Sequence, residues 1–157
     1  MQFSRHILFV LLFIGVTLLT SSKNSSALKL PKSTTCTVTV HIGMIRNLSG
    51  HIQLQIYRDQ SSFKREQPWK QMFLSKSLIK DNKIVYKVTG LTPGTYGFAL
   101  LDDENKDSKM NYGFFLPKEG YGFSDFVHTS YVKRPTFNDF KFELKSNKTV
   151  SMVIRYM

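Results

Sequence analysis

The sequence predicts an antiparallel β-sandwich of about seven strands, Ig-like or transthyretin-like, with one long ordered loop; a small barrel is the alternative. Three observations predict this fold class. Short segments alternate apolar and polar residues with the period of two that half-buried strands show. Turn-forming residues separate these segments at regular spacing, and no longer window has a helical period.

The first two expected strands are residues 37–42 and 52–57, each with one apolar face. A short polar turn at residues 47–50 separates them, so we expect a hairpin. Residues 59–70 lose the alternation and contain Pro68, which indicates a connection. Within that connection, two aromatic side chains are expected to plug the core: Phe63 and Trp69.

The next expected strands are residues 83–89 and 95–101, joined by a turn in which Pro93 fixes φ. A loop of about 37 residues, from 102 to 138, follows them. Two last strands, near residues 140–144 and 150–156, are expected to form a hairpin through the turn at 146–148.

Residues 1–27 have the layout of a secretory signal peptide: a basic start, an apolar run from Ile7 to Leu19, then small polar residues. That run is about 13 residues long, whereas a membrane-spanning helix needs about 20. Small residues permit cleavage after Ser22 or after Ala27. We therefore expect a periplasmic or extracellular protein with one domain, residues 28–157, and no transmembrane segment after signal removal.

The composition is that of a globular protein, with 41% hydrophobic and 21% charged residues. It excludes a disordered tail, a disulfide-stapled miniprotein and a polytopic membrane protein. Cys36 is the only cysteine, so no intrachain disulfide can form. Removal of residues 1–27 takes away Arg5 and Lys23 and leaves 20 basic and 11 acidic residues, a net charge of +9. We expect a basic monomer.

The long loop contains a candidate metal site. Asp103, Asn105 and Asp107 occupy alternate positions, as oxygen ligands do in a tight calcium loop. The EF-hand pattern is incomplete, because Ser108 replaces its glycine and Phe114 its last glutamate. The alternative is a polar turn whose side chains bond nearby backbone N–H groups.

The same loop is rich in aromatic residues, among them Tyr112, Tyr121 and Phe123. If exposed, they would form a platform for a glycan or a protein partner. If buried, they would fold the loop over one end of the sandwich as a lid.

Three basic clusters favour an envelope polyanion as partner, without specific nucleic-acid recognition. The alternative is a set of charges scattered over solvated strand faces. The clusters are Arg58 with Lys64, Arg65 and Lys70; Lys76 with Lys80 and Lys83; and Lys133 with Arg134 and Lys141.

A catalytic role has the weakest support. His128 follows Ser124 and Asp125 closely, and Glu119 with Asp125 offers two carboxylates. No nucleophile-elbow, paired-histidine or glycine-rich phosphate motif accompanies them. We expect no enzyme activity and no cofactor, calcium excepted.

Residues 90–96 (G-L-T-P-G-T-Y) resemble the L-x-P-G-x-Y turn of transthyretin-like surface domains. With the motifs that follow it, the chain resembles the exported bacterial family catalogued as domain of unknown function 2141, over about residues 36–156. Those motifs are Asp103-Glu104-Asn105, Lys109-Met110, residues 117–124 and residues 135–139.

The resemblance implies an Ig-like or transthyretin-like sandwich, placement in the envelope or outside the cell, and no established activity. Asp102 stands where that family usually has histidine. The usual K-M-D-x-N becomes residues 109–113, the stretch to Pro117 is one residue short, and the glycine before that proline is absent. Our expectation is a non-catalytic binding or accessory module of the cell envelope.

Overall fold

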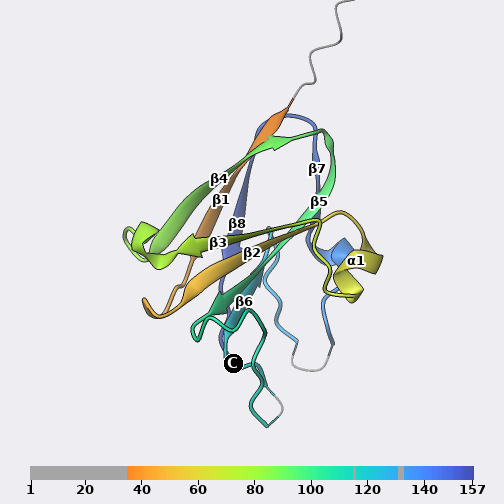
Figure 1. The fold of residues 1–157 in the computed structure, drawn as a ribbon. Helices are drawn as coiled ribbons and strands as arrows, with labels where there is room; N and C mark the ends of the chain where they lie inside the picture. The colour runs from red at the N-terminus through yellow and green to blue at the C-terminus, as the bar shows by residue number, and fades with distance from the viewer. Residues whose placement is uncertain (1–34, 115, 131–132) are drawn as a thin grey trace, which may run out of the picture. The chain divides into compact units, whose positions relative to one another are not determined.

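The computed structural model describes residues 35–114, 116–130 and 133–157. The predicted signal peptide, with its cleavage after Ser22 or Ala27, lies outside these residues. Within them, a three-stranded sheet and a five-stranded sheet face each other across a shared core, which confirms the β-sandwich (Figure 1). The strands are β1 (Cys36–Gly43), β2 (His51–Tyr57), β3 (Lys70–Ser75), β4 (Lys83–Leu91), β5 (Gly94–Asp103), β6 (Gly120–Phe123), β7 (Lys141–Leu144) and β8 (Lys148–Val153).

The three-stranded sheet has the order β4-β1-β8, with β1 antiparallel to β4 and parallel to β8. The five-stranded sheet has the order β3-β2-β5-β6, and β7 pairs with β5 next to β6. Every pairing in this second sheet is antiparallel.

Both predicted hairpins are wrong. β1 and β2 belong to different sheets, and so do β7 and β8. Each short turn therefore carries the chain across the core, and the first one buries Ile45 as it crosses. The alternating pattern identifies the buried face of a strand, but it does not identify the neighbouring strand.

The core between the sheets is built from the predicted apolar faces. Val38, Val40 and Ile42 of β1 are fully buried, as are Ile52, Leu54 and Ile56 of β2. Tyr96, Phe98 and Leu100 of β5 join them, as the alternation predicts. These side chains exclude water from one face of each sheet, which is the main stabilising contribution to the sandwich.

A second apolar layer covers the outer side of the five-stranded sheet. We call its buried members the aromatic cluster. Short helices α1 (Gln60–Lys64) and α2 (Phe137–Phe140) contact each other over this side of the sheet (Figure 1). The aromatic cluster consists of Tyr57, Ala99, Tyr121, Phe123, Phe137 and Phe140.

The two expected plugs of the core behave differently. Phe63 packs on the aromatic cluster, with its ring centroid 4.9 Å from that of Phe140. Trp69 is 51% exposed, so it does not plug the core. The guanidinium of Arg58 lies 5.3 Å from the Trp69 ring centroid and covers part of the indole instead.

The predicted 37-residue loop is shorter than expected, because β5 continues to Asp103 and β6 interrupts the remainder. Two connections result: residues 104–119 between β5 and β6, and residues 124–140, which lead through α2 to β7. No helix in the described part of the chain has the length and apolar character needed to cross a membrane.

Candidate functional site: a charged cluster at the end of β5

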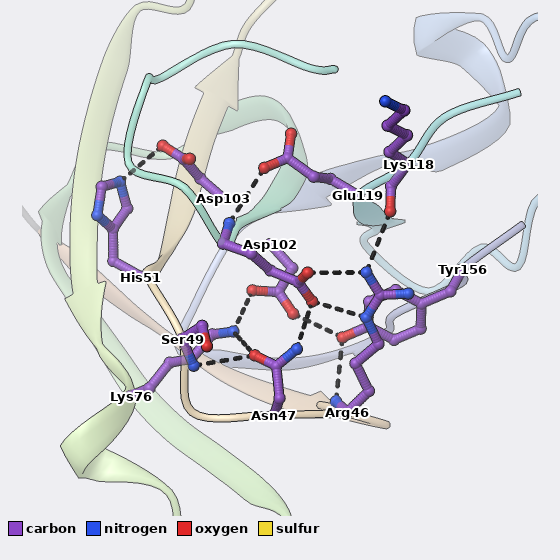
Figure 2. Close-up of polar contacts among 11 residues, drawn as sticks. Arg46, Asn47, Ser49, His51, Lys76, Asp102, Asp103, Lys118, Glu119 and Tyr156 are labelled. Carbon is purple, nitrogen blue, oxygen red and sulfur yellow. Dashed lines mark hydrogen bonds and ion pairs between the residues drawn. The ribbon is translucent and has the colours of Figure 1, made fainter. Parts of the chain in front are cut away.

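Charged and polar side chains from five parts of the chain meet where β5 ends (Figure 2). β5 contributes its last two residues, and β3 leads into the 3₁₀ turn η1 (Lys76–Leu78). The other residues come from residues 46–51, which span the turn between β1 and β2 and the first residue of β2, from the 104–119 connection, and from the chain after β8. We call this group the charged cluster: Arg46, Asn47, His51, Lys76, Asp102, Asp103, Glu104, Glu119 and Tyr156.

The centre of the cluster is a buried ion pair. Lys76 Nζ lies 2.5 Å from Asp102 Oδ1, and the two side chains are 2% and 0% exposed. Asp102 lies opposite Ile52 in the pairing of β5 with β2, so its side chain points into the sandwich. A buried charge is tolerated when an opposite charge compensates it, and each partner here compensates the other. Lys76 thus compensates the charge of the Asp102 carboxylate.

Tyr156 closes the other side of this pair. Its hydroxyl donates to Asp102 Oδ2 at 2.6 Å and accepts from the Arg46 backbone N–H at 3.1 Å. Burial raises the pKa of the Tyr156 phenol, and the hydrogen bond to Asp102 raises it further. The phenol therefore keeps its proton and remains a donor to Asp102.

Glu104 forms a second, more exposed ion pair. Arg46 donates to it twice, from Nε to Oε1 at 2.6 Å and from Nη2 to Oε2 at 2.8 Å. Asn47 Nδ2 donates to Oε1 at 2.8 Å. The hydrogen bonds from Arg46 hold the pKa of the Glu104 carboxyl below its ordinary value. The Arg46 guanidinium also lies 4.3 Å from the Tyr156 ring centroid, which links the two pairs.

Two further buried carboxylates shape the loop that follows β5. Asp103 accepts from the backbone N–H groups of Asp107 and Ser108, at 3.2 and 2.9 Å. Glu119 accepts from those of Glu104 and Asn111, both at 3.1 Å. The connection of residues 104–119 is therefore fixed at its base by the last residue of β5 and by the residue that precedes β6.

A tight backbone approach brings the turn before β2 to this site. Gly50 has a φ of +74°, and a Cβ built on it would lie 1.8 Å from the Asp103 carbonyl oxygen. Only glycine fits there. His51 follows directly, and its Nε2 lies 3.1 Å from Asp103 Oδ2.

The predicted calcium ligands lie together, Asp103 at the end of β5 and the other two in the loop that follows, but they bond backbone amides and one another. Asp103 is buried and bonds backbone amides, while Asn105 and Asp107 are exposed. Asn105 donates to Asp107 Oδ2 at 3.0 Å, as does Asn111 at 2.9 Å, and the bond from Asn111 lowers the pKa of Asp107. This is the geometry of the alternative reading, a polar turn. In the described residues, no three His, Cys, Asp or Glu side chains are grouped as a metal would require; the calcium site stays a prediction.

Of the three residues of the predicted aromatic platform, one is exposed and two are buried. Tyr112 is 56% exposed, in the 104–119 connection. Tyr121 and Phe123 are 8% and 7% exposed, so their assignment to an exposed binding surface is wrong. The physical reason is β6, which pairs with β5 and turns both rings into the aromatic cluster.

The structure keeps only part of the predicted basic clusters on the surface. Lys133 and Arg134 are exposed, as a polyanion site requires. Lys76, by contrast, is buried against Asp102 and does not contribute to a surface patch with Lys80 and Lys83. Sequence reasoning missed this role, because the alternation of Met72 and Leu74 is too short to indicate that Lys76, two residues further on, also points inward.

Besides Glu119, which belongs to the charged cluster, the three other residues considered for catalysis have other contacts. The Ser124 hydroxyl donates to the Phe140 carbonyl at 2.7 Å and accepts from Phe98 N–H at 3.0 Å. Asp125 Oδ1 accepts from Ser151 N–H at 2.8 Å. His128 lies among aromatic rings, including that of Tyr121, and burial lowers the pKa of its imidazole. Ser124 and Asp125 thus hold neighbouring backbone in place.

Comparison with known proteins identifies the family to which the chain belongs. A family model described as "uncharacterized protein conserved in bacteria (DUF2141)" matches residues 40–152, well over half of the chain. Neither a curated protein nor a solved structure matches the chain. The matched range runs from within β1 to within β8 and includes most of the charged cluster. The chain therefore belongs to the DUF2141 family of bacterial proteins.

Proposed function

We propose that this protein is an exported, monomeric and non-catalytic binding or accessory module of the cell envelope. The connection of residues 104–119 is its recognition element. The observation that carries this proposal is the contrast between the base and the tip of that connection.

The base is rigidly held, because Asp103 and Glu119 are buried and bond its backbone at four N–H groups. The tip exposes large apolar side chains: Tyr112 is 56% exposed, Phe114 92% and Leu116 40%. Neighbouring exposed apolar groups mark interaction sites, and binding residues are often placed on loops that a rigid scaffold positions.

The charge around the tip supports an anionic partner. Lys106, Lys109 and Lys118 are exposed in the same connection, and Asp107 is the one acidic side chain exposed there. A shallow, open depression beside the tip has a mainly apolar lining with one basic residue, Lys118. It is lined by Gly113, Phe114, Leu116, Pro117, Lys118 and Met157. An acidic envelope polymer or glycan fits this combination, with lysines pairing its charges and rings packing on its apolar faces.

The test measures retention of the purified full chain by washed cell envelopes at increasing protein concentration. For Phe114→Ser with Leu116→Ser, we expect the concentration for half-saturation to rise on the order of tenfold, because two apolar contacts are lost. The matched control is Val85→Ser with Leu78→Ser, which removes two exposed apolar side chains elsewhere. Equal retention of the loop variant and the control would contradict the proposal.

The same preparation tests export. Protein from the exported fraction is expected to begin at Lys23 or Leu28, the residues after the two predicted cleavage sites. An intact Met1 in cytosolic protein would contradict the proposed location.

A further inference from the structure

The ion pair at the centre of the charged cluster has an unusual geometry. Lys76 Nζ lies 2.5 Å from Asp102 Oδ1, yet no described donor makes a hydrogen bond with proper angles to that oxygen. The amine has therefore approached the carboxyl group without pointing a proton along the usual acceptor direction. The amine and the carboxyl group are thus in direct contact, and the usual hydrogen bond does not join them.

The surroundings of the pair resemble a small reaction site. Both side chains are shielded from water, with 2% and 0% exposure. Tyr156 donates to the second carboxyl oxygen, Oδ2, at 2.6 Å. Asn47 Oδ1 lies 3.3 Å from Lys76 Nζ and accepts from it, which holds the amine in place (Figure 2).

We propose that Lys76 and Asp102 join in an intramolecular isopeptide bond. One proton passes from the Lys76 ammonium to Asp102 Oδ1, which gives a neutral amine beside a neutral carboxylic acid. The amine lone pair then attacks Cγ and forms the Nζ–Cγ bond. A second proton moves from the nitrogen to Oδ1, the Cγ–Oδ1 bond breaks, and one water leaves. Charge and atoms balance, and no oxidant, reductant or other reactant is needed.

Three features of the site favour this step. The reacting groups are held in contact within one fold, and such positioning corresponds to very high effective concentrations. Burial penalises charged groups, so it favours the proton transfer that produces the neutral pair. Tyr156 donates to Oδ2, where negative charge develops as the nitrogen attacks.

The bond would join the end of β3 to β5 across the intervening strand β2. Cys36 is the only cysteine, so a disulfide cannot supply such a cross-link. A covalent link between distant positions restricts the unfolded chain and thereby stabilises the folded one. We expect the melting temperature to exceed that of an unlinked variant by on the order of 10 °C.

The test is mass spectrometry of tryptic peptides from the purified full chain. The expected product is a branched peptide that contains Lys76 and Asp102 and is lighter by one water than its two parts combined. Trypsin is not expected to cut after Lys76, since an acylated lysine is not cleaved. Lys76→Arg is the matched control, because arginine keeps the positive charge but cannot form this bond.

The mass spectrometry has one result that supports the bond and two that overturn it. A branched peptide in the wild type, absent from Lys76→Arg, supports the proposal even if that variant is less stable. Ordinary cleavage after Lys76 in folded protein, unchanged after prolonged incubation, would overturn it. A branched peptide lighter by one ammonia would assign the link to Asn47 and would also overturn it.

Discussion

Two regions of this molecule hold irregular chain against the same five-stranded sheet, and they do so by different means. The charged cluster holds residues 104–119 with carboxylates that accept backbone N–H groups. The aromatic cluster holds residues 124–140 mainly by packing rings, with centroids 4.9 Å apart for Phe123 and Phe140. The first region is held by charged groups and directional hydrogen bonds, and the second by close packing of ring volumes.

This difference predicts which substitutions each region tolerates. Hydrogen bonds to a buried carboxylate fix each backbone atom that they reach, and they leave a costly unpaired charge when a partner is removed. Packed rings can shift slightly, but they cannot accept additional atoms. We therefore expect the charged cluster to respond to partner removal and pH, and the aromatic cluster to respond to added volume.

The largest expected effect comes from Asp102→Ala. It leaves Lys76 buried without its opposite charge and without the proposed bond to Asp102, and it is expected to lower the free energy of unfolding by about 3–5 kcal/mol. Urea denaturation measures this change. The control is the double variant Lys76→Met with Asp102→Leu, which removes both charges together and is expected to lose less. A single variant as stable as the wild type would show that the ion pair does not stabilise the fold.

A smaller effect is expected when volume is added to the aromatic cluster. In Gly97→Ala, the new Cβ would lie 2.6 Å from Phe140 Cε2 and 2.8 Å from Phe137 Cε2. Both rings must move, at an expected cost of about 1–3 kcal/mol of unfolding free energy. Gly43→Ala is the matched strand control, since its Cβ meets nothing within 4 Å. Equal thermal stability of the two variants would mean that the rings move freely.

The smallest effect concerns pH and the Arg46–Glu104 pair. The hydrogen bonds from Arg46 lower the pKa of Glu104 in the folded state, so the unfolded state takes up its proton first as pH falls. The contribution is present above the ordinary value of 4.5 and is lost as pH falls through the lower folded value. Its expected size is under about 1 kcal/mol, because solvent screens this partly exposed pair.

Glu104→Gln isolates this contribution from those of other carboxyls with lowered pKa, such as Asp107 and Asp139. Urea midpoints at about pH 6 and about pH 3.5 are compared for the wild type and the variant. The wild type is expected to lose more stability than the variant. An identical loss in both proteins would show that Glu104 does not contribute.

Much of the fold follows from the residue pattern. Period-two alternation predicts β1, β2, β4 and β5, because each turns one apolar face into the core between the sheets. It does not predict β3, where Met72 and Leu74 alternate with exposed residues for too few positions to be distinctive. β6 is fully buried and has two glycines in four residues, so its sequence resembles a loop.

The candidate site was less accessible to sequence reasoning. Asp103, Asn105 and Asp107 attract attention because they occupy alternate positions in the chain, and they do lie together at the end of β5 and in the loop that follows. The sequence does not show the roles of Lys76 and Arg46, because these roles depend on partners far away in sequence. Local patterns report which side chains are buried, whereas contacts between distant charges are decided by how the strands assemble.

The parallel pairing of β1 with β8 has a mechanical consequence. This ladder runs from Val38 opposite Lys148 to Gly43 opposite Val153, and it joins the first and last strands of the sandwich. Tension between the two chain ends pulls β1 and β8 in opposite directions along their common axis. The load then falls on all the hydrogen bonds of the ladder at once, in shear, and does not peel them apart singly. The parallel ladder thus resists tension applied between the start of β1 and the end of β8.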